Sequence, residues 1–177
     1  MQLKRWIVLV GMMGCGKTSI GQALSRELAL PVVDTDTEIE KAAAMSIAEI
    51  FERDGEAFFR QKEGQVLARL LEGAPAIMST GGGAFLAEGN RELLLKDAYV
   101  VWLNCDLETL WARVKGKDDR PLLQTEDPKG TLAALLDERL PVYEQAHINV
   151  SSGQGTTVQS VIDDILSKAK AAQILEA

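Results

Sequence analysis

A glycine-rich segment near the start of the chain has the composition of a phosphate-binding loop. Gly11 to Thr18 fits the pattern G-x-x-x-x-G-K-[ST], directly after the apolar run Trp6 to Val10 and before a helix-period segment. Glycines let successive backbone N–H groups turn toward a phosphate, and the following helix adds its unpaired N–H groups. Lys17 is expected to reach the terminal phosphates of a nucleotide, and the Thr18 hydroxyl is expected to bind Mg²⁺.

Two questions stay open at this loop. The segment is also consistent with a glycine-rich turn that holds no ligand, and Cys15 is either a small residue that the turn tolerates or an oxidation-sensitive thiol. The pattern alone does not choose among GTPases, motor ATPases and kinases. A GTPase usually carries an Asn-Lys-x-Asp segment that reads guanine, which this sequence lacks, and the chain is short for a motor ATPase domain.

Two carboxylates follow the second apolar run of the chain. Asp34 and Asp36 flank Thr35 after Pro31 to Val33, and at spacing i, i+2 they lie on one side of an extended backbone. Because ligands gather at the carboxyl edge of a parallel sheet, Asp34 is expected to hold Mg²⁺ through water. Asp36 is expected to accept a hydrogen bond from a substrate hydroxyl and to act as a base. The alternative is helix capping, with Thr35 and Glu38 forming a capping box.

Three charged side chains fall on helix faces that are otherwise apolar. In a helix expected over residues 56–71, Glu63 lies in the apolar stripe and Arg60 at its edge, so the two can pair. Arg139 lies in the middle of a second apolar face. The other members of that face are Leu132, Leu135, Leu136, Leu140 and Tyr143. Because a buried unpaired charge is costly, these positions favour a cleft and, for an arginine, a carboxylate ligand. A surface pair on a rotated helix is the alternative for Glu63, and Pro141 is expected to kink or end the second helix.

Glycines and loop arginines complete the candidate site. The run Gly81 to Gly83 follows the third apolar run, Ala76 to Met78, and lets a ligand accept hydrogen bonds from the backbone, with a flexible turn as the alternative. Arg120 lies in the loop-like segment 115–129 and could neutralise a transferring phosphoryl group. Arg113 precedes it, with a planar guanidinium free to stack on adenine. The alternative for both arginines is an ordinary solvated side chain.

Short apolar runs alternate with helix-period segments, which predicts a parallel sheet covered by helices on both faces. The five expected strands are Trp6 to Val10, Pro31 to Val33, Ala76 to Met78, Tyr99 to Leu103 and His147 to Val150. A closing amphipathic helix is predicted by the stripe Val158, Val161, Ile162, Ile165 and Leu166. Residues 169–177 are expected to fray. The fold class is therefore α/β, as one domain over residues 1–177.

Composition excludes several classes of protein. The 177 residues carry a formal net charge of −7 at pH 7, and no basic face indicates a nucleic-acid partner. Two cysteines, Cys15 and Cys105, form no disulfide framework, which fits a reducing compartment, and a single histidine, His147, cannot supply a metal cluster. No apolar run reaches the roughly 20 residues that cross a bilayer, and the segment before Gly11 is too short for a signal peptide. A cytoplasmic protein without a membrane partner is expected.

Taken in order, the motifs resemble the shikimate kinase family along nearly the whole chain. The matching pieces are Gly11 to Thr18, Asp34-x-Asp36, Phe59-Arg60 with Glu63, Gly81-Gly82-Gly83, Arg120-Pro121-Leu122, and Arg139 with Tyr143. The resemblance implies a nucleoside-monophosphate-kinase-like P-loop fold with three αβα layers and a five-stranded parallel sheet in the order 2-3-1-4-5. It also implies phosphorylation of the 3-hydroxyl group of shikimate by ATP with Mg²⁺, in aromatic amino-acid biosynthesis.

The resemblance further implies a role for each candidate residue. The ATP site comprises Gly14, Cys15, Gly16, Lys17, Thr18, Ser19, Arg113 and Arg120. The shikimate site comprises Asp36, Arg60, Glu63, Gly81, Gly82, Gly83 and Arg139, with Arg60 and Arg139 on the carboxylate. Catalysis falls to Lys17, Asp36 and Arg120, and the metal to Thr18 and Asp34. Residues 34–62 form a substrate-binding region and residues 115–124 a lid that excludes water, on a chain expected to act as a monomer.

Two positions depart from the family pattern. The phosphate loop ends Lys17-Thr18-Ser19 where the family often has Lys-Ser-Thr, but Thr18 still offers the hydroxyl. Residues 151–157 lack the proline that some members place on the second face of the adenine. That face of the adenine site is therefore not assigned from the sequence.

Overall fold

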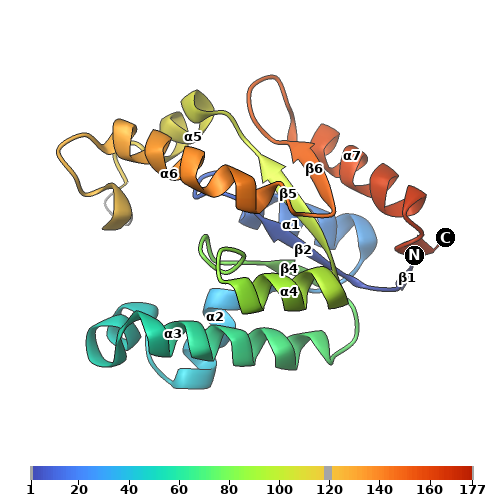
Figure 1. Ribbon diagram of the computed structural model, residues 1–177. Coiled ribbons are helices and arrows are strands. Elements are labelled where there is room, and N and C mark those ends of the chain that lie inside the picture. The colour runs from blue at the N-terminus through green and yellow to red at the C-terminus, as the bar shows by residue number, and fades with distance from the viewer. Residues whose placement is uncertain (1, 118–120, 177) are drawn as a thin grey trace.

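A five-stranded parallel sheet forms the centre of the molecule, seen in a computed structural model that describes residues 2–117 and 121–176 (Figure 1). Its strands are β2 (Trp6–Val10), β3 (Val32–Asp34), β4 (Ile77–Ser79), β5 (Ala98–Asn104) and β6 (Ile148–Ser151). They lie side by side in the order β3-β4-β2-β5-β6, and every neighbouring pair is parallel. Counted along the chain, this is the predicted order 2-3-1-4-5.

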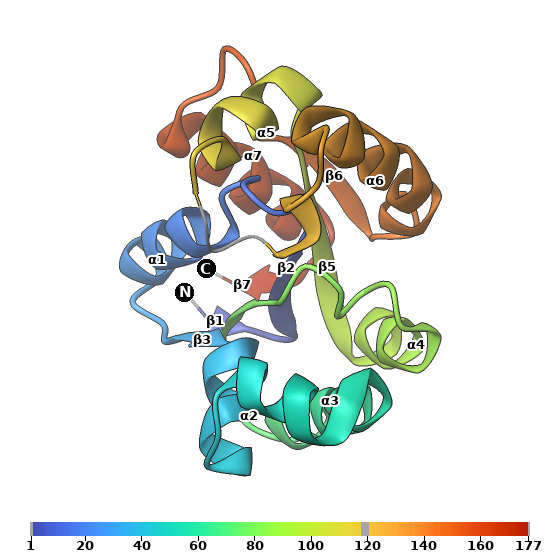
Figure 2. The same cartoon turned by 90° about the vertical axis from the view of Figure 1, so that its left-hand side faces the viewer.

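Helices cover both faces of this sheet, as the alternating pattern predicts. They are α1 (Lys17–Leu28), α2 (Thr35–Ala43), α3 (Ile47–Leu71), α4 (Glu88–Asp97), α5 (Leu107–Val114), α6 (Pro128–Tyr143) and α7 (Val158–Ala171), with a 3-10 turn η1 (Pro121–Leu123). In Figures 1 and 2, α1 and α7 lie together on one face, and α4 and α6 lie on the other. The αβα layering is therefore confirmed. None of the helices that the structure describes is both long enough and apolar enough to cross a membrane.

The central strands are apolar throughout because they are covered on both faces. All five residues of β2 are buried, and β5 is buried from Ala98 to Leu103. Beside them, the His147 ring accepts a hydrogen bond at Nδ1 from the Val100 N–H at 3.0 Å, so this histidine has the structural role of a strand end. The predicted strand Trp6 to Val10 agrees with β2 at both ends.

Two helices differ in part from the predictions. Helix α3 begins at Ile47, but its backbone breaks at Gly55, where φ is 81° and ψ is 176°. Its second half therefore begins at residue 56, as predicted, and its first half was not predicted. Helix α6 continues past Pro141 to Tyr143, so the proline does not end it. Near the helix end, proline removes only the last backbone hydrogen bonds.

The two ends of the chain pair with each other, so the expected fraying after Ala169 is wrong. Strands β1 (Gln2–Leu3) and β7 (Leu175–Glu176) form a small antiparallel sheet. Ile174 and Leu175 are buried in the main core, and Figure 1 places both termini together at one end of the molecule. Apolar side chains after α7 therefore complete the core instead of remaining in solvent.

Candidate functional site

The predicted phosphate-binding loop connects β2 to α1 in the expected strand-to-helix context. Gly16 is the N-cap of α1, with φ 100°, a left-handed conformation that glycine adopts without strain. No side chain caps this helix, which leaves its first N–H groups for an anion. Lys17 Nζ donates to the carbonyl oxygens of Gly11 at 2.8 Å and Met12 at 3.0 Å, so the ammonium group lies against the loop.

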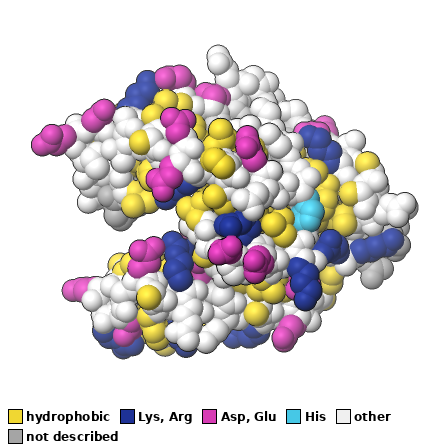
Figure 3. Space-filling model, viewed as in Figure 1, with side chains coloured by type: hydrophobic (Ala, Val, Ile, Leu, Met, Phe, Trp, Pro, Cys, Tyr) yellow, Lys and Arg dark blue, Asp and Glu magenta, His cyan; other side chains and the backbone are white. Residues whose placement is uncertain are grey.

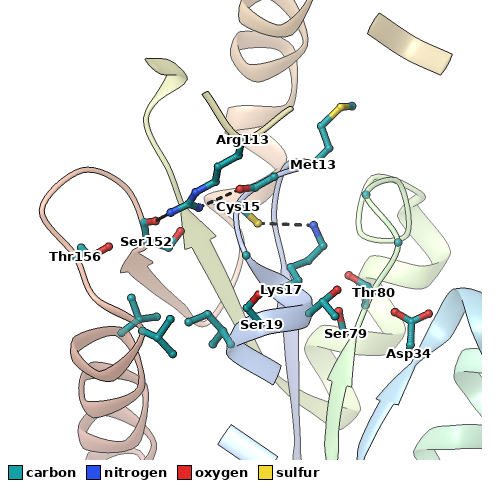
Figure 4. A pocket seen from close by; sticks show the side chains of 18 of the residues that line it. Met13, Cys15, Lys17, Ser19, Asp34, Ser79, Thr80, Arg113, Ser152 and Thr156 are labelled. Atoms are coloured by element: carbon teal, nitrogen blue, oxygen red, sulfur yellow. Dashed lines mark hydrogen bonds between the residues drawn. The ribbon is translucent and has the colours of Figure 1, made fainter. Parts of the chain in front are cut away.

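A cavity of about 590 Å³ opens beside this loop and joins it to the carboxyl ends of β3 and β4. Figure 4 shows Arg113 and Ser152 on one side of the cavity, Asp34 and Thr80 on the other, and Lys17 between them. The wider lining includes the loop residues Met13 to Ser19, then Asp36, Ser79, Gly81, Gly82, Lys117, Thr156, Thr157, Val158 and Val161. The structure thus brings both predicted carboxylates and the predicted nucleotide residues other than Arg120 to one space.

Arg113 links the two walls of the nucleotide end of the cavity. Its Nη1 donates to the Gly14 carbonyl at 3.0 Å, and its Nη2 donates to the Ser152 carbonyl at 3.1 Å. A second wall residue was not anticipated: Val158, expected on the buried face of α7, is 49% exposed and lines the cavity. The other members of its stripe, Val161, Ile162, Ile165 and Leu166, are buried as predicted. An exposed apolar side chain at this wall is suited to the flat face of a base.

The two predicted carboxylates have different surroundings. Asp34 ends β3 and caps α2, since its Oδ1 accepts from the Thr37 N–H at 2.9 Å. The alternative of a capping box formed by Thr35 and Glu38 is therefore excluded, because Asp34 is the N-cap residue. Thr35 is fully buried, and its hydroxyl accepts from the Gly81 N–H at 3.2 Å. Asp34 is the N-cap residue because its backbone is still extended, so its side chain can fold back onto the first N–H groups of the helix.

Asp36 has an unusual acidity for a half-buried carboxyl. Burial raises its pKa from 3.8 to about 6, and the nearby carboxylates of Asp34, Glu63 and Glu40 raise it in the same direction. Lys17 partly opposes this shift, which places the carboxyl within the field of the phosphate-loop lysine. A carboxylate with a pKa near 6 is ionised at neutral pH and is a stronger proton acceptor than an ordinary aspartate.

Side chains approach the backbone of the glycine segment Gly81 to Gly83 so closely that a Cβ at two of its positions would displace them. A Cβ on Gly81 would lie 2.6 Å from Asp36 Oδ1, and a Cβ on Gly83 would overlap Arg60 Nη2. The Gly82 carbonyl accepts a hydrogen bond from the Tyr143 hydroxyl at 3.0 Å. The glycine segment is thus fixed from both sides, which excludes the alternative of a merely flexible turn.

Arg60 and Glu63 face inward, as the helix period predicted. Glu63 is 1% exposed and accepts from Arg60 Nη1 at 2.8 Å and from Asn90 Nδ2 at 3.0 Å. Burial raises the pKa of the Glu63 carboxyl, and the hydrogen bonds from its two partners oppose that shift. The Arg60 guanidinium also lies over the Phe59 ring, 5.2 Å from its centroid. The alternative of a surface pair is therefore excluded.

Arg139 reaches the phosphate loop from α6. Its Nη1 lies 4.0 Å from Met12 Sδ. The Arg139 side chain is half-buried, and Leu132 and Tyr143 are the buried members of its helix face. One helical turn further on, Tyr143 contacts the glycine segment that Arg60 also touches. Figure 3 shows this side of the molecule hollowed between the part that carries α6 and the part that carries α2 and α3.

Two predicted roles depend on residues or ligands beyond these contacts. Arg120 and part of the predicted lid, residues 115–124, lie outside the described residues. Thr18 is exposed at the start of α1, and Asp34 uses Oδ1 for capping, which leaves Oδ2 for a metal-bound water. Among residues 2–117 and 121–176, no group of three or more His, Cys, Asp or Glu side chains could hold a metal ion. This sparse donor set fits Mg²⁺, which usually keeps several waters and takes its other ligands from phosphates.

Comparison with known proteins gives a consistent result. The family model described as shikimate kinase matches residues 13–170. The chain is 54% identical to a shikimate kinase of Ruegeria pomeroyi over 165 residues, covering 93% of this chain and 85% of that one. It is 57% identical to a shikimate kinase of Cereibacter sphaeroides over 161 residues, covering 91% and 81%.

Solved structures agree with the sequence comparison. The shikimate kinase from Acinetobacter baumannii, solved in complex with shikimate, is 36% identical, has a TM-score of 0.87 and covers 97% of this chain and 96% of that one. A gluconokinase from Sinorhizobium meliloti, 15% identical with a TM-score of 0.60, shares the fold alone. Sequence, fold and the ordered set of site residues lead to one assignment: the chain belongs to the shikimate kinase family.

Proposed function

We propose that the chain transfers the γ-phosphoryl group of ATP to the 3-hydroxyl group of shikimate, giving shikimate 3-phosphate. The observation that carries this proposal is the convergence on the glycine segment Gly81 to Gly83. Asp36, Arg60 and Tyr143 all contact this segment, and Asp36 shares a cavity with the phosphate loop. A proton acceptor and cationic groups for an acid-bearing alcohol thus lie beside a nucleotide site.

ATP binding follows from the phosphate loop and Arg113. A triphosphate would draw the Lys17 ammonium away from the two loop carbonyls and onto its β- and γ-oxygens, where it stabilises developing charge. Gly14 to Ser19 supply the N–H groups and hydroxyls of the loop. In this proposal, Arg113 covers one face of adenine and Val158 covers the other, since both line the cavity. Arg120 is expected to approach the transferring group, within a lid over residues 115–124.

Mg²⁺ is proposed as the metal of this reaction. The Thr18 hydroxyl would bind it directly, and Asp34 Oδ2 would bind it through water. When bound, the ion neutralises charge on the β- and γ-phosphates. We expect the chain to act as a monomer, since Thr18, Asp34 and the described cavity lining all come from one chain.

The acceptor is held by its carboxylate and its hydroxyls. Arg60 and Arg139 offer planar guanidinium groups that match a carboxylate by paired hydrogen bonds. Glu63 holds Arg60, and the backbone of Gly81 to Gly83 offers donors and acceptors to the ring hydroxyls. Asp36 takes the proton of the reacting hydroxyl as the phosphoryl group arrives. These contacts orient the acceptor hydroxyl toward the phosphoryl group, and exclusion of water from the site prevents hydrolysis of ATP.

The acidity of Asp36 predicts the acid limb of the pH profile. Because the base must be ionised, activity is lost when the carboxyl is protonated, and its pKa of about 6 places that loss about two units above the range of an ordinary aspartate. At saturating Mg²⁺ and ATP, kcat/KM for shikimate should be flat above about pH 7. It should fall about tenfold per pH unit below pH 6. A limb with an apparent pKa near 4 would contradict the role of Asp36.

Gly83→Ala tests the contact between the glycine segment and Arg60. The new Cβ would overlap Arg60 Nη2, the far end of a flexible side chain, so the protein folds but the guanidinium must move. KM for shikimate should rise about tenfold or more, because a charged hydrogen bond is lost, while KM for ATP stays within about twofold. Gly82→Ala is the matched control, since its Cβ meets nothing within 4 Å, and its effect should be much smaller. Equal effects at both positions would contradict this reading of the segment.

A steady-state assay of ADP formation, with shikimate, gluconate and a nucleoside monophosphate as separate acceptors, tests the proposed function. Shikimate should give the largest kcat/KM, and the phosphorylated product should carry its phosphate on the 3-hydroxyl group by ³¹P and ¹H NMR. A chain that binds ATP but shows no shikimate-dependent turnover would be a nucleotide-binding module. Preferred turnover of gluconate would instead place the chain with the kinases that share only its fold.

A further inference from the structure

Helix α4 supplies the acceptor site with a side chain that no motif in the sequence singles out. Asn90, 6% exposed, lies in the first turn of α4 and donates from Nδ2 to Glu63 Oε2 at 3.0 Å. A carboxylate only accepts hydrogen bonds, so the group that faces it is the amide nitrogen. The same oxygen, Oε2, accepts from Arg60 Nη1 at 2.8 Å. Asn90 therefore adds the second donor to the carboxylate that holds Arg60.

Glu63 needs that second donor because it is almost completely buried. Its side chain is 1% exposed and shares the inner face of α3 with Phe59, Val66 and Leu67. A buried carboxylate is stable as an ion only when hydrogen bonds compensate for the lost water. Burial raises its pKa, and Arg60 and Asn90 are the groups that lower it. Without Asn90, one of these two compensating groups is lost.

Arg60 has a competing partner that would draw it along the helix. Glu56 Oε1 lies 3.7 Å from Arg60 Nε, one turn before it on α3, and the Glu56 side chain is 70% exposed. Glu63 lies nearly one turn after it, at 2.8 Å. The guanidinium lies against Gly83, and an ionised, fixed Glu63 carboxylate is expected to hold it there. A protonated or displaced Glu63 leaves Arg60 to Glu56 and to water.

The same turn of α4 also fixes the other side of this contact. Arg91 Nη1 donates to the Phe85 carbonyl at 3.3 Å and to the Leu86 carbonyl at 3.1 Å. These carbonyls follow the glycine segment, with Ala84 between them. Neighbouring residues of one helical turn thus hold both the partner of Arg60 and the end of the loop that Arg60 touches.

We propose that Asn90 is a positioning residue for the acceptor site, acting through Glu63 to hold Arg60 against Gly83. This inference rests on the proposed function, because the carboxylate that Arg60 meets is that of shikimate. Asn90 touches neither substrate, so its loss should weaken shikimate binding and leave ATP binding and the transfer step almost unchanged.

Asn90→Leu removes the donor while keeping a side chain of similar size. By calorimetry at about pH 8, its Kd for shikimate should be about tenfold or more weaker than that of the wild type. KM for ATP, and kcat at saturating shikimate, should stay within about threefold. Gly89→Ala, on the same turn, is the matched control because its Cβ meets nothing within 4 Å, and it should bind shikimate as the wild type does.

Asn90→Asp gives a readout that a purely structural role would not move. The new carboxyl would face Glu63 Oε2, and two carboxylates in contact share one proton, so one of the two has a strongly raised pKa. Arg60 favours the ionised form of Glu63, so the shared proton resides on the aspartic acid and restores a donor. The Asp36 carboxylate, which interacts with Glu63, adds a negative charge that also favours retention of the proton. Shikimate affinity of Asn90→Asp should therefore rise about tenfold from pH 8 to pH 6, without such a gain in the wild type.

The outcomes separate this inference from the proposed function. A wild-type chain that binds no shikimate would overturn both. Wild-type binding together with equal affinity in folded Asn90→Leu would overturn the role of Asn90 alone, as would equal losses in Asn90→Leu and Gly89→Ala. If Asn90→Leu does not fold, the isosteric Asn90→Asp decides. If the shikimate affinity of Asn90→Asp depends on pH as that of the wild type does, the inference is overturned. If the affinity of this variant recovers at low pH, the inference is supported.

Discussion

Asp36→Asn is expected to lower kcat by about 100-fold or more and, at the same time, to make the protein more stable. The amide keeps the size of the side chain and its capacity to donate and accept hydrogen bonds, but it cannot take the proton of the acceptor hydroxyl. Steady-state kinetics at about pH 8 with saturating ATP would measure the loss. A kcat within about threefold of the wild type would show that Asp36 only orients the substrate.

The gain in stability follows from the raised pKa of the same group. A carboxyl whose pKa is 3.8 when exposed and about 6 in the fold binds its proton more tightly in the folded state. Its ionised form therefore lowers the free energy of unfolding above pH 6, and this penalty disappears as pH falls from about 6 toward 3.8. A shift of this size corresponds to about 3 kcal/mol, which partial exposure of Asp36 reduces to about 1–2 kcal/mol.

Urea unfolding at about pH 8 should therefore give Asp36→Asn a free energy of unfolding about 1–2 kcal/mol above that of the wild type. Asp34→Ala is the matched control, two residues earlier, because Asp34 caps α2 through the Thr37 N–H. Loss of that cap should lower the free energy of unfolding by about 1 kcal/mol. A destabilised Asp36→Asn would contradict the cause assigned to its pKa.

Arg139→Ala is expected to raise KM for shikimate by roughly 10- to 150-fold, with little change in KM for ATP. The loss corresponds to about 1.5–3 kcal/mol for one charged hydrogen-bonded contact. Because the proposed partner of the guanidinium is the shikimate carboxylate and not the transferring phosphoryl group, kcat at saturating shikimate should change much less. Arg139→Lys should recover only part of the affinity, since an ammonium group cannot form the paired hydrogen bonds.

A shikimate derivative whose carboxylate is replaced by a carboxamide separates this contact from general damage to the site. The wild type should bind the carboxamide much more weakly than shikimate, whereas Arg139→Ala should discriminate far less between the two ligands. The change in this discrimination between the wild type and Arg139→Ala, expressed as a free energy, is the coupling free energy between the guanidinium and the carboxylate. Unchanged KM for shikimate in a folded Arg139→Ala would remove Arg139 from the acceptor site.

The sheet was predictable because its strands are signalled locally. Apolar runs such as Trp6 to Val10 mark the buried strands, and the five predicted strands differ from the observed ones by one residue or less at every end. The order of the strands came from the family resemblance. Pairing of β1 with β7 was missed, since it joins residues from opposite ends of the chain and neither strand has a periodic pattern long enough to detect.

The inward-facing charges of the site were predictable from helical period, and their partners were not. The apolar stripes around Glu63 and Arg139 indicated that both side chains point inward, which the structure confirms. Sequence spacing gave no signal for the contacts of Tyr143 with Gly82 and of Asn90 with Glu63, because each joins distant helices and loops. The sequence also did not indicate that Asp34, and not Thr35, caps α2. The cap depends on where β3 ends, and Asp34 is its last residue.

A crystal structure of the chain with ADP and shikimate bound would test the acceptor site most directly. Arg60 and Arg139 should both lie within hydrogen-bonding distance of the shikimate carboxylate, with the 3-hydroxyl group against Asp36 and facing the phosphate loop. A shikimate molecule whose carboxylate meets neither arginine, or whose 3-hydroxyl group points away from the nucleotide, would contradict the proposed reaction geometry.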